Sequence, residues 1–209
     1  MELKRFLEKL SSDTPTPGGG SASALAGALS ASLIIMVAGL SSKKDKSKKK
    51  GMEEIRKKGL SIQKRLFQAI EEDSKSFDAV LKVFRLPRSS EKERLRRVKE
   101  IQRAYQRATL TPQRVCQQSL RLLEYSESLI LTGNPNAVSD AAVAAFLADA
   151  ACAGGLFNIK INLAAVTDKN FAKKMNILMR NWERERNQRM KAIHKNLNLS
   201  GLRKPESPS

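Results

Sequence analysis

The chain has 209 residues, a net charge of +18, 41% hydrophobic residues and only 5% aromatic residues. This length suffices for one domain with a buried core, and the dominance of Ala, Leu, Lys, Arg and Ser favours helices over sheet. Cys116 and Cys152 lack metal-ligand spacing and the N-terminus does not resemble a secretory leader, so the composition argues against a disulfide framework and predicts a cytoplasmic protein.

The predicted elements begin with a short helix over residues 2–11. The sequence SSDTPTPGGGS then predicts a loop, and a helix rich in small residues follows over 21–42, with Ser21 or Ser23 as its cap. An amphipathic helix is expected from residue 52 to residue 85, ended by Pro87. Its predicted buried stripe consists of Ile55, Ile62, Leu66, Ala69, Ile70, Phe77, Val80, Leu81 and Phe84.

The second half of the chain also predicts helices. The first covers residues 89–110. The second has Pro112 in its first turn and reaches about residue 131, and two more cover residues 137–166 and 168–197. The sequence TGNPN separates two of them as a turn. We expect an all-α, single-domain antiparallel helical bundle over 1–197 with the small-residue helices 21–42 and 137–165 at its centre. Residues 198–209 are expected to form a disordered basic tail.

The charge is distributed in blocks. Residues 43–110 carry 22 basic and ten acidic side chains, and residues 167–209 carry 11 basic and four acidic ones. The segments 1–42 and 111–166 are nearly neutral, which predicts two buried elements and a basic exterior. Such a field favours polyanions, whether nucleic acid, acidic lipid or a polyglutamylated metabolite, and does not choose among them.

The stretch PTPGGGSASALAGALSASLIIMVAGL, residues 15–40, has no charged residue and is followed by a lysine cluster, as in a membrane span. Its first half is only weakly hydrophobic, however. The matching segment 137–166 contains Asp140, Asp149 and Lys160, which are costly in lipid. A membrane span is therefore the less favoured interpretation, and we expect a buried helix.

The glycine run before this helix has two interpretations. Glycines let the backbone approach a ligand closely, and a helix N-terminus offers free N–H groups to an anionic or carbonyl-rich ligand. The alternative is a flexible turn between helices. The run is neither a Walker P-loop nor a Rossmann fingerprint, because no GK[ST] follows it and no strand precedes it.

Three stretches together resemble a known family. They are FLEKLSSDTPTPGGGSASALAGALSASLIIMVAGLSSKK, EEDSKSFDAVLKVFRLP at 71–87 and GNPNAVSDAAVAAFLADAACAGGLFNIKINL at 133–163. In this order they resemble the cyclodeaminase/cyclohydrolase family, which includes the cyclodeaminase domain of formiminotransferase-cyclodeaminase and stand-alone methenyltetrahydrofolate cyclohydrolases. The resemblance implies an all-helical folate enzyme, often a homodimer, with no metal and no bound cofactor beyond its tetrahydrofolate substrate.

Two reactions occur in that family. A cyclohydrolase opens 5,10-methenyltetrahydrofolate with water to 10-formyltetrahydrofolate, and a cyclodeaminase closes 5-formiminotetrahydrofolate to the methenyl form and releases ammonia. Both need proton transfers, which a positioned carboxylate can perform. No formiminotransferase-like segment accompanies these 209 residues, which tilts the expectation towards the cyclohydrolase. The alternatives are the cyclodeaminase, a relative that has lost catalysis, or a basic binding module for nucleic acid or acidic surfaces.

The resemblance assigns the catalytic role to Asp140 in the Ser-Asp motif; the alternative is that Asp140 or Ser139 only caps a helix. His194, the single histidine, is expected at the surface, which leaves a Ser-His-Asp triad or a histidine metal site without support. The substrate, with or without a polyglutamate tail, is expected to contact Pro17, Gly18, Gly19, Gly20, Ser21, Lys44, Asp73, Ser139, Asn158 and Asn162.

Overall fold

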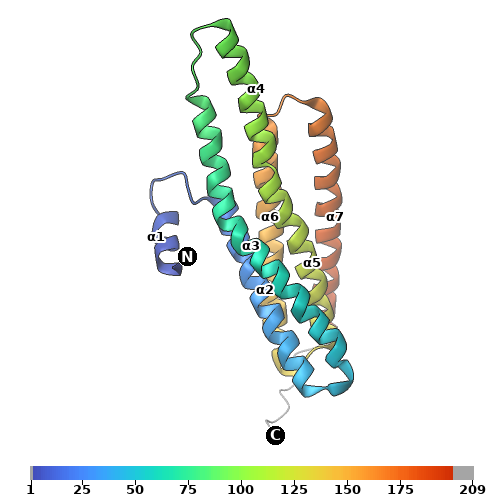
Figure 1. Ribbon diagram of the computed structural model, residues 1–209. Coiled ribbons are helices and arrows are strands. Elements are labelled where there is room, and N and C mark those ends of the chain that lie inside the picture. Colours follow the sequence, from blue (N-terminus) through green and yellow to red (C-terminus); the bar gives the residue numbers. More distant parts are fainter. Residues whose placement is uncertain (1, 200–209) are drawn as a thin grey trace.

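The computed structural model describes residues 2–199, and these form helices without strands (Figure 1). The helices are α1 (Leu3–Leu10), α2 (Gly19–Lys44), α3 (Lys49–Phe84), α4 (Glu91–Ala108), α5 (Leu110–Thr132), α6 (Val138–Ala164) and α7 (Lys169–Leu199), with short 3₁₀ turns at Lys46–Lys48 and Pro135–Ala137. The predicted all-α bundle is confirmed. Of the predicted tail, residues 198 and 199 continue α7, and the remainder lies outside the described residues.

The two small-residue helices are at the centre, as predicted. Helix α2 packs mainly against α3 and α6, while α5 packs against α6 and α7 (Figure 1). Ser30 donates a hydrogen bond of 2.7 Å to the carbonyl of Ala144 across the α2–α6 contact. A side chain at Gly27 would meet Leu66 at 3.0 Å and Ala151 at 3.4 Å, so the helices approach closely here because these residues are small.

The order of these contacts shows that α2 and α6 run antiparallel. Ser30 contacts residue 144, Gly27 faces residue 151, and Gly19 lies near Asn158, so positions rise along one helix as they fall along the other. The start of α2, with its glycine run, therefore lies beside the last turns of α6. This arrangement decides which residues share a site.

Within the described residues, α2 and the segment Pro135–Ala164 are long and apolar enough to cross a membrane. About half of each apolar window is buried inside the bundle, 50% and 44% respectively. Core helices of globular proteins have the same length and composition, and the packing of α2 against α3 and α6 explains the uncharged stretch without a bilayer.

The predicted serine cap of α2 is wrong. The helix begins at Gly19 with Gly18 as its N-cap, and no side chain caps it. Ser23 instead donates a hydrogen bond of 2.6 Å to the carbonyl of Gly19 within the helix, and Ser21 is fully buried against α3. Because the glycine run forms the first turn of the helix, no side chain accepts hydrogen bonds from the first N–H groups of α2.

Part of the predicted buried stripe of α3 is exposed. Phe77 and Phe84 are 40% and 44% exposed, whereas Ile62, Leu66 and Val80 are buried. The last turns of α3 extend with α4 as a hairpin beyond most of the bundle (Figure 1). The two helices are joined there by a small separate cluster around Val80, by the rings of Phe84 and Tyr105, and by hydrogen bonds from Arg97 to the carbonyl of Phe84. Fewer neighbours are therefore available to cover the two phenylalanines.

Candidate active site

A cavity of about 470 Å³ lies where the start of α2 meets α3, the end of α4 and the last turns of α6. This volume is in the range of small-molecule sites. The loop and α2 contribute Pro15, Thr16, Gly18, Gly19 and Gly20; the helices contribute Asp73, Ser76, Phe77, Val80, Tyr105, Ala108, Asn158, Ile161 and Asn162, with Ala164 and Ala165 at the end of α6.

Among the residues that the structure describes, Asp73 is the one acidic side chain that lines this cavity. Its Oδ2 lies 3.0 Å from the hydroxyl of Ser21, which also lies 3.0 Å from the carbonyl oxygen of Ile70. A hydroxyl has one proton and two acceptor sites. Ser21 therefore donates to an ionised Asp73, or accepts from a protonated Asp73 while it donates to Ile70, so both protonation states of the carboxyl group have a hydrogen-bond partner.

Burial raises the pKa of Asp73 above its ordinary value, while hydrogen bonds from the side chain and backbone of Ser21 oppose this effect. The charged form loses hydration in the cavity wall, and the bonds from Ser21 recover only part of that loss. A carboxyl group in this state accepts and returns a proton more readily near neutral pH than an ordinary surface aspartate does.

Gly20 permits the carboxylate to lie against the backbone of α2. A Cβ atom at this position would lie 2.6 Å from Oδ2 of Asp73 and closer still to Oδ1. At Gly19 a Cβ atom would meet only the amide nitrogen of Asn158, at an ordinary 3.9 Å. The glycine at position 20 is thus required by the position of Asp73.

Two asparagines of α6 supply amide oxygens to the cavity. The side-chain nitrogen of Asn158 donates to the carbonyl of Gly154 at 2.8 Å, and that of Asn162 donates to the carbonyl of Ala108 at 3.0 Å. With the nitrogens bonded in this way, neither Oδ1 atom has a protein donor among residues 2–199. Both side chains line the cavity, where these oxygens are free to accept hydrogen bonds from a ligand.

Apolar side chains also line the cavity, namely Phe77, Val80, Tyr105 and Ile161. Flat apolar surfaces of this kind suit a planar ring. Sequence reasoning missed this apolar lining. Phe77 and Val80 follow Asp73 at helical spacing, which was the available signal, but nothing in the sequence indicates that Tyr105 of α4 joins them.

The structure unites most, but not all, of the predicted site residues. Gly18, Gly19, Gly20, Asp73, Asn158 and Asn162 line the cavity. Ser21 does not line it but holds Asp73, and Pro17 belongs to the loop without lining the cavity.

Asp140, Ser139 and Lys44 are not in the cavity. Asp140 precedes Asn158 by 18 positions on α6, which corresponds to about 27 Å along the helix. Lys44 is at the far end of α2, about 37 Å from Gly19 by the same measure. The capping alternative is wrong, because the N-cap of α6 is Ala137 and no side chain caps that helix. In this chain the cavity carboxylate is Asp73, not Asp140.

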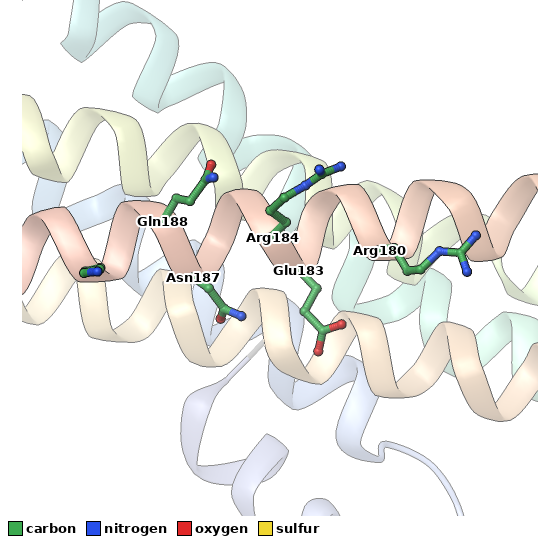
Figure 2. Close-up of a pocket in the computed structure, with 6 residues that line it drawn as sticks. Arg180, Glu183, Arg184, Asn187 and Gln188 are labelled. Atoms are coloured by element: carbon green, nitrogen blue, oxygen red, sulfur yellow. The ribbon is translucent and has the colours of Figure 1, made fainter.

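Two other features outside the cavity carry no site. His194 is exposed, as predicted, with its ring 5.9 Å from that of Phe146. A shallow opening of about 420 Å³ lies on α7 beside Arg180, Glu183, Arg184, Asn187 and Gln188. Figure 2 shows these side chains on one face of α7, with Arg184 and Gln188 on one side of the helix axis in this view and Glu183 and Asn187 on the other, so the opening is formed by a single helix.

The fold and cavity define an all-α protein with a carboxylate-bearing small-molecule site, and comparison with known proteins identifies the family. The formiminotransferase-cyclodeaminase family model matches residues 2–181, and the chain belongs to that family.

A methenyltetrahydrofolate cyclohydrolase of Methylorubrum extorquens is 33% identical over 172 residues, covering 81% of this chain and 83% of the relative. The Gallus gallus formimidoyltransferase-cyclodeaminase is 32% identical over 81% of this chain and 32% of its own length. The crystal structure of formiminotetrahydrofolate cyclodeaminase from Thermotoga maritima superposes with a TM-score of 0.85 at 29% identity, covering 95% of this chain and 96% of that one.

Proposed function

We propose that this chain is a folate one-carbon enzyme that hydrolyses 5,10-methenyltetrahydrofolate to 10-formyltetrahydrofolate. The observation that carries the proposal is the single carboxyl group, Asp73, held by Ser21 in a cavity with an apolar lining and free amide oxygens. The relative named methenyltetrahydrofolate cyclohydrolase, which aligns with most of both chains, supports this reaction.

In the proposed mechanism, Asp73 carries the proton. Its carboxylate takes a proton from the water that attacks the methenyl carbon, and a tetrahedral hydroxyl intermediate forms between N5 and N10. The bond from this carbon to N5 then breaks, and Asp73 returns its proton to N5. The intermediate's hydroxyl proton leaves to solvent, and its oxygen becomes the formyl oxygen on N10.

The remaining cavity residues position the substrate. The pterin ring lies against Phe77 and Tyr105, and its N–H groups donate to the oxygens of Asn158 and Asn162. The glutamate part, with or without further glutamates, extends to the basic exterior, consistent with the net charge of +18. The proposal needs no metal and no bound cofactor, because the reaction consists of water addition and proton transfers.

The second candidate is the cyclodeaminase reaction. The same carboxyl group can protonate a departing ammonia, and the structural neighbour from Thermotoga maritima is named a formiminotetrahydrofolate cyclodeaminase. One experiment separates the two candidates. Loss of methenyl absorbance above the buffer rate supports the cyclohydrolase, whereas methenyl formation with ammonia release from the formimino substrate supports the cyclodeaminase. Failure of both reactions would overturn the proposal.

Ser21→Ala is expected to move the acidic limb of the kcat/KM profile to higher pH. The hydroxyl of Ser21 lowers the pKa of Asp73, so its removal raises this pKa further, although the backbone bond of residue 21 stays, and the ionised carboxylate forms only at higher pH. Ser74→Ala is the matched control, because its hydroxyl lies 3.3 Å from that of Ser21 and makes no bond to Asp73. Profiles that superpose for Ser21→Ala and the wild type would contradict this coupling.

We also propose that the enzyme is a homodimer in the cytoplasm. Leu29, Met36 and Leu40 leave an exposed apolar stripe on α2, and Val143 and Phe146 do the same on α6, next to it. Exposed apolar area on adjacent helices is typical of an interface between subunits. Both cysteines are free and buried, consistent with a reducing compartment.

Met36→Glu/Phe146→Glu is expected to halve the sedimenting mass, because two charges would enter the interface. Leu95→Glu, at a position that is 66% exposed on α4, is the control and should sediment as the wild type does. If the wild-type protein sediments as a monomer, the proposed dimeric state is wrong. The proposed reaction does not depend on this result.

A further inference from the structure

A groove of about 740 Å³ lies between α3, α5 and α7, apart from the substrate cavity. One rim is formed by Lys58, Ser61 and Arg65, which share a face of α3, and the other by Gln117, Gln118, Arg121 and Tyr125 of α5. No described residue lines both the groove and the cavity. Between them an ion pair of Glu72 with Arg114 joins α3 to α5.

At the base of the groove, the nearby carboxylates form ion pairs with an arginine of α7. Arg189 of α7 lies 3.5 Å from Glu124, 3.5 Å from Glu127 and 3.4 Å from Glu185. One guanidinium is thus surrounded by three carboxylates, which fixes α5 against α7. Glu124 and Glu185 themselves line the groove, where four cations, Lys58, Arg65, Arg121 and Arg189, outnumber them.

Two of the three rim cations lack a close ion-pair partner. Arg65 makes no ion pair within the described residues, and Arg121 has only Glu124 at 3.9 Å. Lys58 pairs with Glu54, one turn earlier on the same exposed face, at 2.6 Å. Three cations therefore face one opening and have either no anionic partner or a solvent-exposed one.

Uncharged hydrogen-bonding side chains also line the groove. In the described part of the chain, Ser61, Gln117, Gln118 and the hydroxyl of Tyr125 make no hydrogen bond to protein. Guanidinium groups bind phosphate through two parallel N–H donors, and amide and hydroxyl groups add single bonds. Trp182 is only 8% exposed, so Tyr125 is the one aromatic ring with appreciable exposure among the lining residues, and most of the lining is polar.

We propose that this groove binds a chain of linked phosphates, either inorganic oligophosphate or the triphosphate of a nucleotide. The chain bridges Arg65 on α3 and Arg121 on α5, with Lys58 as a third positive charge. The site is separate from the folate cavity and does not depend on the proposed reaction.

Isothermal titration with tripolyphosphate, ATP and AMP tests this site on the full-length protein. Saturable 1:1 binding of tripolyphosphate and ATP, with AMP much weaker, is expected. Equal affinities would identify the phosphate chain alone as the ligand, and tighter ATP binding would identify a nucleotide as the source. Absence of saturable binding of both triphosphates would overturn the proposal.

Arg65→Gln/Arg121→Gln is expected to weaken tripolyphosphate binding at least about tenfold and to leave methenyl hydrolysis unchanged. Arg94→Gln/Arg96→Gln removes the same charge from exposed positions on α4 and is the matched control. Gln117→Glu, at an exposed position, should weaken binding in a chain that keeps both arginines. Equal weakening by the groove and control variants would mean non-specific charge attraction and would overturn the site, as would unchanged binding by both groove variants.

Discussion

Asp73→Asn is expected to lower kcat by about 10²–10⁴-fold, the usual contribution of a positioned general acid–base. Asparagine has nearly the same shape and can still accept a hydrogen bond from Ser21, so the cavity keeps its form. Asp140→Asn is the matched control, because it makes the same change on α6 outside the cavity and should retain wild-type turnover. If Asp140→Asn lost activity and Asp73→Asn kept it, the proposed role of Asp73 would be wrong.

The same variant has a second, independent readout in thermal stability. The pKa of Asp73 is raised in the folded state, so the folded protein binds this proton more tightly than the unfolded chain does. The carboxyl group therefore favours folding below its unfolded pKa, and this contribution is lost as pH rises through the folded pKa. Asp73→Asn should consequently have a higher Tm than the wild type at neutral pH.

Gly20→Ala is expected to lower kcat/KM by about 100-fold, the cost of misplacing a catalytic group by about 1 Å. The added methyl group would lie 2.6 Å from Oδ2 of Asp73, so the carboxylate must move out of its position against α2. Circular dichroism should show the same helix content as the wild type, because alanine suits a helix better than glycine does.

Gly19→Ala provides the neighbouring control. Its added atom meets only the amide of Asn158 at 3.9 Å, which is an ordinary contact, so a much smaller loss is expected. Gly51→Ala on α3, with nothing within 4 Å, should leave activity unchanged. Equal losses from Gly20→Ala and Gly19→Ala would show that the first turn of α2 tolerates no added side chain, and would contradict a specific clash with Asp73.

The fold could be predicted from the sequence because its signals are local. Small residues at helical spacing over 21–42 and 137–165, and Pro87 after the long amphipathic segment, predicted the central helices and a break that the structure has. The ends of elements were less predictable. The sequence predicted a serine as the cap of α2, but the glycine run forms the first turn of that helix. Ser21 is hydrogen-bonded to Asp73 instead.

The site was predictable only in part, because sequence motifs do not give the direction in which helices pass one another. The glycine loop was recognised, but the acid was sought in the Ser-Asp motif at the start of α6. Since α2 and α6 are antiparallel, the loop lies beside Asn158 at the other end of that helix, and the nearest acid comes from α3. Tyr105 depends on how α4 folds back over α3, which no local pattern specifies.

The most direct test of the central claim is a crystal structure of Asp73→Asn with 5,10-methenyltetrahydrofolate bound. The account predicts the pterin ring between Tyr105 and the amide oxygens of Asn158 and Asn162, with the methenyl carbon next to the side chain at position 73. A folate bound instead at the first turn of α6, next to Asp140, would contradict it.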